Sequence, residues 1–330
     1  MKSDHPPVNF GKTGVLLINL GTPDSTNWWD IRKYLKEFLS DTRVIEVNPI
    51  LWKIILNLFI LNLRPSKTAK AYKEIWLEKE NMSPLRYFTI MQTKKLLDKI
   101  GNKNLIVDYA MRYGNPSIQE KINKLSKAGC ERLIVLPLYP QYAAATTATV
   151  CDEVYRVLMK MRWQPSLQIV PHYESEPLYI EALVNSLKLK ISKLSWKPDL
   201  VLASYHGIPQ KYFDKGDPYH CYCQKTSRLI SEKFKDIEIK TTFQSRFGPE
   251  AWLKPYTDKT LETLPTEGKK NVLVICPGFA SDCVETLEEI SIQGKESFLN
   301  SGGENFDTVP CLNDNDDHIN LLEQLTKSAL

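Results

Sequence analysis

Apolar residues fall in short runs along the chain, and the segments between the runs have helical spacing. The runs are continuous rather than alternating, which is typical of parallel strands that are buried on both faces. They cover residues 13–20, 105–110, 132–138, 167–171, 199–205 and 271–277. Helices are predicted between them at 83–100, 117–129 and 176–194. This alternation predicts an α/β fold with doubly wound, Rossmann-like parallel sheets.

The pattern occurs twice, which predicts two similar lobes. The same order of strand, proline, aromatic residue, small residues and helix is found in VLPLYPQYAAATTATVCDEV (135–154) and in VICPGFASDCVETLEEI (274–290). We expect a first lobe over residues 1–172, a second lobe over 173–312, and a C-terminal helix over 313–330 that packs back on the first lobe.

Composition and charge exclude several classes of protein. With 330 residues, 42% hydrophobic and 25% charged, the chain is typical of a globular protein with two lobes. The net charge of +4 comes without a long run of like charges, so nucleic acid is not expected as a partner. The loops after the predicted strands contain neither GxGxxG nor a Walker A lysine, which disfavours a nucleotide-binding protein.

The cysteines and the N-terminus indicate a cytoplasmic protein. Seven cysteines are an odd number, and the first 14 residues lack the apolar core of a signal peptide. We therefore expect reduced thiols.

Residues 50–63 form a long apolar segment, ILWKIILNLFILNL. At 14 residues it is shorter than the roughly 20 that cross a bilayer, so it is not a transmembrane helix. Two interpretations remain open. The segment is either a buried core helix, or a helix that lies on a membrane surface or lines the mouth of an apolar pocket. The second would bring the protein into peripheral contact with the inner face of the membrane.

Acidic residues follow the last predicted strand. If a helix starts near Ser281, four side chains fall at i, i+3, i+7 and i+11, close to one face, whereas Glu288 points elsewhere. These four are Asp282, Glu285, Glu289 and Gln293. They are either a helix cap with a solvated face, or, since this is the edge where such sheets bind ligands, a site for a divalent metal or a proton relay.

His206 ends another predicted strand, in the turn SYHGIP (204–209). A neutral imidazole there can bind a metal or accept a proton. A single histidine without an HxxxH or HExxH partner does not make a tight zinc site, so the metal would be a passing substrate.

Aromatic side chains lie in or beside the predicted turns. Each one alone is explained by core packing, but together with residues 50–63 they favour a pocket for a large, flat, apolar ligand. They are Tyr113, Tyr142, Tyr205, Trp252 and Phe279.

Eight ordered blocks of the chain resemble the ferrochelatase family. The blocks are LLINLGTPDS (16–25), FLSDTRVIE (38–46), MRYGNPSI (111–118), LPLYPQYAAATT (136–147), SYHGIP (204–209), GDPY (216–219), TTFQSRFGPEAWLKPYTD (241–258) and CPGFASDCVETLEEI (276–290). Members of this family insert ferrous iron into protoporphyrin IX in the last step of haem synthesis. The resemblance implies that activity, with Fe²⁺ and protoporphyrin IX as substrates.

The resemblance also implies roles for particular residues. His206 and Glu285 would be the catalytic pair facing the pyrrole nitrogens, and Glu289, Asp282 and Ser281 would continue a polar track for metal and protons. The porphyrin would stack on Tyr142, Trp252 and Phe279, above Arg112 and Tyr113. Its propionates would lie near Arg64, Tyr72 and Ser83. A hydrophobic lip of the pocket, at about 34–65, would include the apolar segment 50–63.

Some residues depart from the family pattern. Cys283 stands where several members have histidine, and Leu20 stands near the metal where others have methionine or tyrosine. The chain lacks the cysteine-rich extension that carries a [2Fe-2S] cluster in some relatives, and Cys221 and Cys223 are only a C-x-C pair. No resident cofactor is therefore expected.

Two other tetrapyrrole functions stay open. One is a cobalt chelatase for another tetrapyrrole, which would share the fold and the histidine and glutamate. The other is a non-catalytic porphyrin or haem carrier, which would need the pocket but not the acidic residues.

Overall fold

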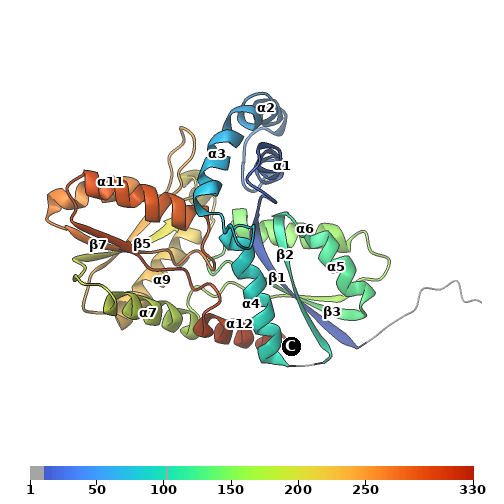
Figure 1. Cartoon of the computed structure of the whole chain (residues 1–330). Coiled ribbons are helices and arrows are strands. Elements are labelled where there is room, and N and C mark those ends of the chain that lie inside the picture. The colour runs from blue at the N-terminus through green and yellow to red at the C-terminus, as the bar shows by residue number, and fades with distance from the viewer. Residues whose placement is uncertain (1–10, 102) are drawn as a thin grey trace, which may run out of the picture.

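Two parallel sheets of four strands form the framework of the protein (Figure 1). The structure is a computed structural model that describes residues 11–101 and 103–330. Of the first 14 residues, for which no signal-peptide core is expected, residues 1–10 lie outside the described residues. The first sheet has the order β2-β1-β3-β4, with β1 (Lys12–Thr22), β2 (Leu105–Gly114), β3 (Cys130–Pro137) and β4 (Ser166–Ile169). The second has the order β6-β5-β7-β8, with β5 (Leu200–His206), β6 (Ile239–Gln244), β7 (Asn271–Ile275) and β8 (Asn305–Thr308).

The two sheets have the same topology, which confirms the predicted α/β fold with two similar doubly wound lobes. Every neighbouring pair of strands is parallel. The apolar runs form the strand interiors, and residues 15–18 of β1 and 201–203 of β5 have no exposed surface. Because β6 (IKTTFQ) is interrupted by polar residues and β8 has only four residues, neither has the apolar run that predicts a buried strand.

Helices cover both faces of each sheet, as the periodicity predicts. Those of the first lobe are α1 (Trp28–Leu39), α4 (Pro84–Ile100), α5 (Ile118–Lys127) and α6 (Thr149–Leu158). Those of the second are α7 (Pro177–Ser192), α8 (Gln210–Asp214), α9 (Tyr219–Lys233), α10 (Thr257–Thr263) and α11 (Lys295–Asn300). Helices α4 and α5 begin after Ser83 and Ser117. The hydroxyl oxygens of these serines accept hydrogen bonds from the backbone N–H groups of Arg86 and Glu120, which explains where the helices start.

The lobes share a continuous core and polar contacts. The amide of Gln92 in α4 donates to the hydroxyl of Ser281 at 2.9 Å and to the carbonyl of Asn313 at 2.8 Å. The last helix, α12 (Asp316–Ser328), packs against α7 and α4 and so touches both lobes. The boundaries near residues 172 and 312 stay predictions.

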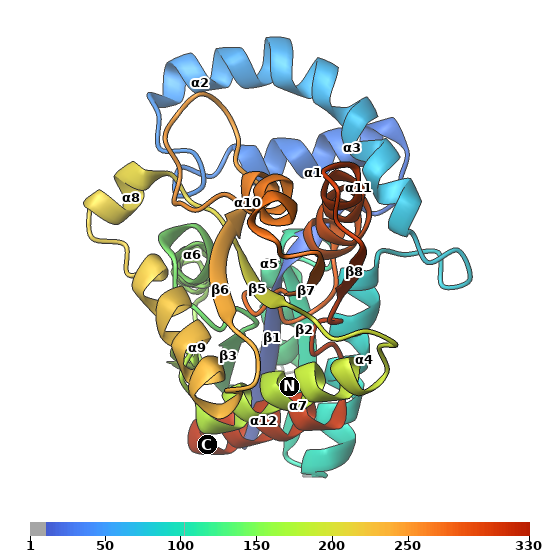
Figure 2. The same cartoon turned by 90° about the vertical axis from the view of Figure 1, so that its left-hand side faces the viewer.

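The apolar segment 50–63 lies within one long bent helix that crosses above α1 (Figure 2). This helix consists of α2 (Pro49–Ile55), the π-helical η1 (Leu56–Ile60) and α3 (Leu61–Ile75). Its two large buried side chains between residues 50 and 63 are Leu56 and Leu61, whereas six large apolar side chains are more than half exposed: Ile50, Leu51, Ile54, Leu58, Phe59 and Leu63. The interpretation as a buried core helix is therefore wrong. In the described part of the chain, no helix is both long and apolar enough to cross a membrane.

Candidate active site

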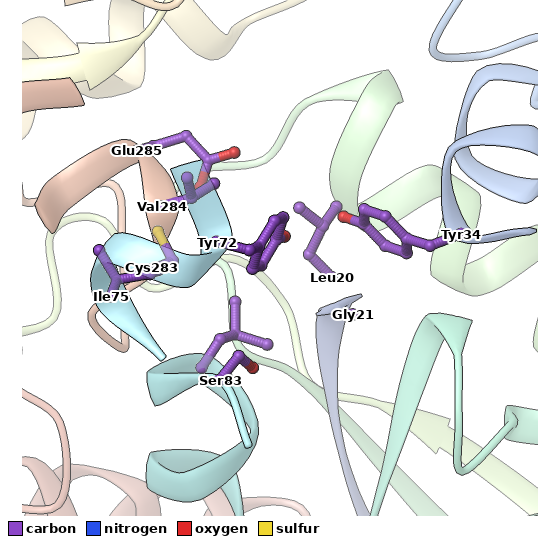
Figure 3. A pocket seen from close by; sticks show the side chains of 10 residues that line it. Leu20, Gly21, Tyr34, Tyr72, Ile75, Ser83, Cys283, Val284 and Glu285 are labelled. Atoms are coloured by element: carbon purple, nitrogen blue, oxygen red, sulfur yellow. The ribbon is translucent and has the colours of Figure 1, made fainter. Parts of the chain in front are cut away.

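A small cavity lies at the carboxyl end of β1 between the two lobes (Figure 3). Its walls come from β1, α1, α3 and α4 of the first lobe, and from the segment after β7 of the second. The lining residues are Leu20, Gly21, Tyr34, Tyr72, Ile75, Ser83, Leu85, Cys283, Val284 and Glu285. Apolar walls with a few oxygen atoms and one carboxylate suit a mostly apolar ligand.

Gly21 allows the first two strands to approach closely at this cavity. Its φ is +116°, and a Cβ atom there would lie 1.8 Å from the carbonyl oxygen of Tyr113 on β2. Only glycine fits such a position. The glycine of the LGTPD turn is therefore needed for the shape of the cavity floor.

His206 ends β5 with its imidazole half-buried. Its Nδ1 lies 2.6 Å from the carbonyl oxygen of Gly207, and since a carbonyl only accepts, Nδ1 carries the hydrogen. In the neutral ring the lone pair is then on Nε2. The ring centroid is 6.4 Å from that of Trp252, and the indole N–H of Trp252 donates to the carbonyl of Phe247 at 2.9 Å.

Glu289 is held by two residues at the end of β6. The backbone N–H of Ser245 donates to its carboxylate at 2.7 Å, and the hydroxyl of Ser245 donates to the other carboxylate oxygen. Gln244 donates to the same carboxylate at 3.4 Å and to the backbone carbonyl of Glu285 at 2.7 Å. Burial raises the pKa of Glu289, although the Ser245 hydrogen bonds and the nearby His206 oppose that rise.

Glu285 faces the tyrosines of the first lobe across the cavity (Figure 3). Burial raises the pKa values of the Tyr34 and Tyr72 hydroxyls, and the Glu285 charge raises them further. Burial also raises the pKa of the Cys283 thiol, and the charge of the same carboxylate raises it further. Near neutral pH these three groups therefore stay protonated and can act as neutral hydrogen-bond donors.

Asp282 points away from this group and anchors the chain instead. Its carboxylate accepts hydrogen bonds from the side chain of Asn313 at 2.7 Å, from the hydroxyl of Thr286 at 3.0 Å and from the backbone N–H of Cys311 at 3.3 Å. The side chain is buried. These contacts fix the segment before the acidic helix.

The acidic helix is a π-helix, η4 (Glu285–Gly294), and α11 continues it. The i to i+5 spacing of a π-helix pairs Gln293 with Glu288 on the exposed side. Gln293 therefore does not belong to the stripe that α-helical spacing predicts. Glu285 and Glu289 do share contacts with Gln244.

Two arginines of the first lobe differ in their partners. Arg112 forms an ion pair with Asp41, which also accepts the hydroxyl of Tyr113 at 3.0 Å. Arg64 is different, because among the described residues it has no carboxylate partner. Its guanidinium lies 4.5 Å from the ring centre of Phe247, and burial lowers its pKa.

The remaining predicted aromatic residues surround the same region. Tyr142 is half-buried in the loop after β3, and Phe279 is half-buried in the loop after β7. Tyr205 is fully buried, and its hydroxyl lies 3.0 Å from that of Ser227, so it belongs to the core. Within 11–101 and 103–330, no group of three or more His, Cys, Asp or Glu side chains is arranged to hold a metal ion.

Known proteins match this chain over its length. A family model described as Ferrochelatase matches residues 12–330. Curated relatives named ferrochelatase include one from Allorhizobium ampelinum, 54% identical over 100% of this chain and 97% of that relative. Another, from Rhizobium meliloti, is 54% identical over 99% of this chain and 98% of that relative.

The chain belongs to the ferrochelatase family. Solved structures with the same fold include SirB from Bacillus subtilis with Fe3+, with a TM-score of 0.59, 11% identity, and coverage of 96% of this chain and 95% of that one. A second is the sirohydrochlorin chelatase SirB from Bacillus subtilis subspecies spizizenii in complex with cobalt, with a TM-score of 0.57, 10% identity, and coverage of 96% and 95%. At this identity the likeness shows the fold alone.

Ten of the residues predicted from the ferrochelatase resemblance fall into four groups. Four line the cavity: Leu20, Tyr72, Ser83 and Glu285. His206, Glu289 and Trp252 form a second group at the ends of β5 and β6. Arg112 and Tyr113 lie behind the cavity in the Asp41 network, and Asp282 lies in its own hydrogen-bonded anchor.

Several residues of the site were not predicted from the sequence. Tyr34 lines the cavity, and Gln244 and Ser245 hold the acidic helix. Tyr34 lies in an amphipathic helix, where an aromatic residue is normally interpreted as part of the hydrophobic core. Gln244 and Ser245 lie within the TTFQSRFGP part of a ferrochelatase block, so that block was the available signal.

Proposed function

We propose that the chain catalyses the reaction of the ferrochelatase family, the insertion of Fe²⁺ into protoporphyrin IX to give protohaem in haem biosynthesis. The full-length family match carries this proposal. Together with the curated relatives, it favours this reaction over a cobalt chelatase and over a non-catalytic carrier.

His206 is proposed as the base that removes protons from the pyrrole nitrogens. The Gly207 carbonyl holds Nδ1–H, so the Nε2 lone pair is available to accept a proton. The hydrogen bond also fixes the plane of the ring, which limits the reorientation needed during transfer.

Glu285 and Glu289 are proposed to attract Fe²⁺ and to take up released protons. Glu285 lies on the cavity wall, and Glu289 lies next in line along the same helix, beside His206. Two neighbouring carboxylates attract a divalent cation and compete for the same protons. The contacts of Asp282 favour an anchoring role over its predicted metal contact.

The first lobe is proposed to bind the porphyrin. Tyr72 and Ser83 offer hydroxyl groups to a propionate, and Arg64 offers a cation without a carboxylate partner among the described residues. Tyr142 of the first lobe offers an aromatic surface for stacking, and Trp252 and Phe279 of the second lobe offer two more. Arg112 and Tyr113 support this wall from behind.

The test is an anaerobic incubation of the purified protein with protoporphyrin IX and Fe²⁺, in which porphyrin fluorescence and haem absorbance are followed. The wild type should form haem over many turnovers, and Glu285→Ala should lose this activity but still bind porphyrin. Glu288→Ala is the matched control, because Glu288 is on the same helix and pairs with Gln293. Stoichiometric porphyrin binding without turnover in the wild type would instead support a carrier.

The exposed apolar side chains of residues 50–63 are proposed to contact a membrane surface, from which a lipophilic porphyrin can enter. Six large apolar side chains on one bent helix exceed what is usual for scattered surface residues. Co-sedimentation with phosphatidylglycerol-containing vesicles should fall at least fivefold in the double variant Leu58→Asp, Phe59→Asp. The exposed double variant Leu189→Asp, Leu299→Asp, in the second lobe, should bind vesicles like the wild type.

The absence of a resident iron–sulfur cluster stays part of the proposal. All seven cysteines carry free thiols, and Cys221 is exposed whereas Cys223 is fully buried. The C-x-C pair therefore does not present two thiols to one cluster. Anaerobically purified protein should lack cluster absorbance in the visible range and bound sulfide.

A further inference from the structure

The segment that follows β5 leaves the second lobe and touches the first lobe at two points. We call residues 210–219 the strap; it contains α8 and the GDPY turn. At the first point, the hydroxyl of Tyr212 accepts the N–H of Glu46 at 3.0 Å and donates to the carbonyl of Val44 at 3.1 Å, and Lys215 forms an ion pair with Glu46 at 2.6 Å. The second point of contact is Asp217.

The carboxylate of Asp217 accepts one hydrogen bond from each lobe. Its Oδ2 accepts the N–H of Ala144 at 2.8 Å, and its Oδ1 accepts the N–H of Tyr219 at 3.0 Å. Ala144 is the first residue of the π-helix η2 (Ala144–Ala148), and Ala143 before it has no side-chain oxygen. The first N–H groups of a helix have no partner within the helix. Asp217 of the second lobe therefore supplies an acceptor that the first lobe lacks.

Tyr142 lies between two residues that the second lobe holds. On one side is Ala144, bound to Asp217. On the other is Gln141, whose amide donates to the hydroxyl of Thr226 at 3.0 Å, with both side chains buried. Asp217 also lies close to Tyr142. Burial raises the pKa of the Tyr142 hydroxyl, and the Asp217 charge raises it further.

We infer that Asp217 is a positioning residue, which fixes the loop of Tyr142 from the opposite lobe and so sets one aromatic wall of the porphyrin site. The inference rests on the proposed function, in which Tyr142 contacts the porphyrin. It assigns a role to the GDPY turn, which the catalytic and metal-binding residues leave unexplained.

The effect of Asp217 should be on porphyrin binding rather than on the chemical step. His206 precedes the strap but is fixed separately, because its Nδ1 donates to the carbonyl of Gly207 and the N–H of Gly207 donates to the carbonyl of Gln244 at 2.8 Å. Glu285 and Glu289 are held by Gln244, and within the described residues neither side chain forms a hydrogen bond or an ion pair with the strap. Loss of uniform binding raises KM and leaves kcat unchanged.

Asp217→Asn tests this directly, with Asp214→Asn as the matched control. Asp214 also lies in the strap, but in the described part of the chain its carboxylate accepts a hydrogen bond only from Gln210 within the same helix. We expect the KM for porphyrin to rise about fivefold in Asp217→Asn, the size of a lost helix cap, with kcat and the KM for Fe²⁺ within about twofold. The control should behave like the wild type.

Ala144→Pro removes the donor and leaves Asp217 in place. Proline is tolerated at the first position of a helix, and Ala143 already has the extended conformation that precedes proline. This variant should show the same rise in KM, and the double variant with Asp217→Asn should be no worse than either single one. Additive effects, a fall in kcat alone, or an unchanged KM in both single variants would overturn the inference.

Porphyrin binding measured without iron separates this inference from the proposed function. If the wild type binds porphyrin without forming haem, the proposed function fails. The inference then still requires about fivefold weaker porphyrin binding in both single variants, by fluorescence titration. Equal affinities in the variants and the wild type would overturn it.

Discussion

The two lobes have the same strand order, yet they supply different chemistry to the site. In each lobe the third strand, β3 or β7, leads through a loop into a π-helix, η2 or η4. The first of these helices has the sequence AATTA and the second begins with ETLEE. The shared backbone pattern therefore supplies shape in the first lobe and negative charge in the second.

The first strands of the lobes differ in the same way. β5 ends at His206, whereas β1 presents Leu20 and the tightly packed Gly21 at its corresponding end. In the first lobe Arg112 is paired with Asp41, whereas Arg64 has no carboxylate partner among the described residues. We propose that the second lobe carries the acid–base groups and that the first lobe carries most of the binding surface.

His206→Ala should have the largest effect. Loss of a general base typically lowers kcat by roughly 10² to 10⁴ fold. Porphyrin affinity should stay within about twofold, because the porphyrin walls lie mainly in the first lobe. Single-turnover haem formation and porphyrin fluorescence titration measure the two quantities separately, and retained turnover would remove His206 from its assigned role.

Asp41→Asn should lower stability rather than activity. The change leaves the mostly buried Arg112 without its carboxylate, which costs about 3 kcal/mol of the free energy of unfolding. Urea denaturation measures this loss, and the activity per folded molecule should be retained. Asp152→Asn breaks a more exposed pair with Arg43 and should cost less than about 1 kcal/mol. Equal losses in the two variants would contradict the distinction between buried and exposed pairs.

His318 should make the folded protein sensitive to acid. Burial lowers the pKa of His318 from 6.5 to about 4, and its Nδ1 donates to the carbonyl of Asn313, which in turn holds Asp282. The unfolded chain binds a proton below pH 6.5 and the folded chain does not, so this stability is complete above pH 6.5 and is lost as the pH falls toward 4.

Between pH 7 and pH 5 the buried histidine should account for about 2 kcal/mol of lost stability. His318→Asn keeps a donor near the position of Nδ1 but does not titrate. Between pH 7 and pH 5 its free energy of unfolding should therefore fall by about 2 kcal/mol less than that of the wild type. Urea titrations of both proteins at the two pH values measure the difference. Parallel pH dependence would show that His318 is already protonated in the folded state.

Arg64→Met should have the smallest effect of this series. The variant keeps most of the apolar contact with Phe247 but removes the cation proposed for a propionate. The KM for porphyrin should rise about fivefold, which corresponds to about 1 kcal/mol. Lys67→Met, an exposed change one turn further along the same helix, serves as the control and should not change KM.

The sequence predicted the fold well because the buried parallel strands are continuous apolar runs. It also brought His206 and Glu285 into the candidate site, since both follow such strands. It missed the π-helical geometry, which turns Gln293 toward Glu288 and away from the site. The support of Glu289 by Ser245 depends on a backbone φ of +65° at a residue that is not glycine, and local sequence rules do not predict that conformation.

The central claim is that the second lobe performs the chemistry and the first lobe binds the porphyrin. It is tested most directly by measuring kcat and the porphyrin dissociation constant in parallel for Glu289→Gln and Arg64→Met. We predict at least about a tenfold fall in kcat with unchanged affinity for Glu289→Gln, and about fivefold weaker affinity with unchanged kcat for Arg64→Met. If both variants lowered kcat, or if both weakened porphyrin affinity, the result would contradict this division between the lobes.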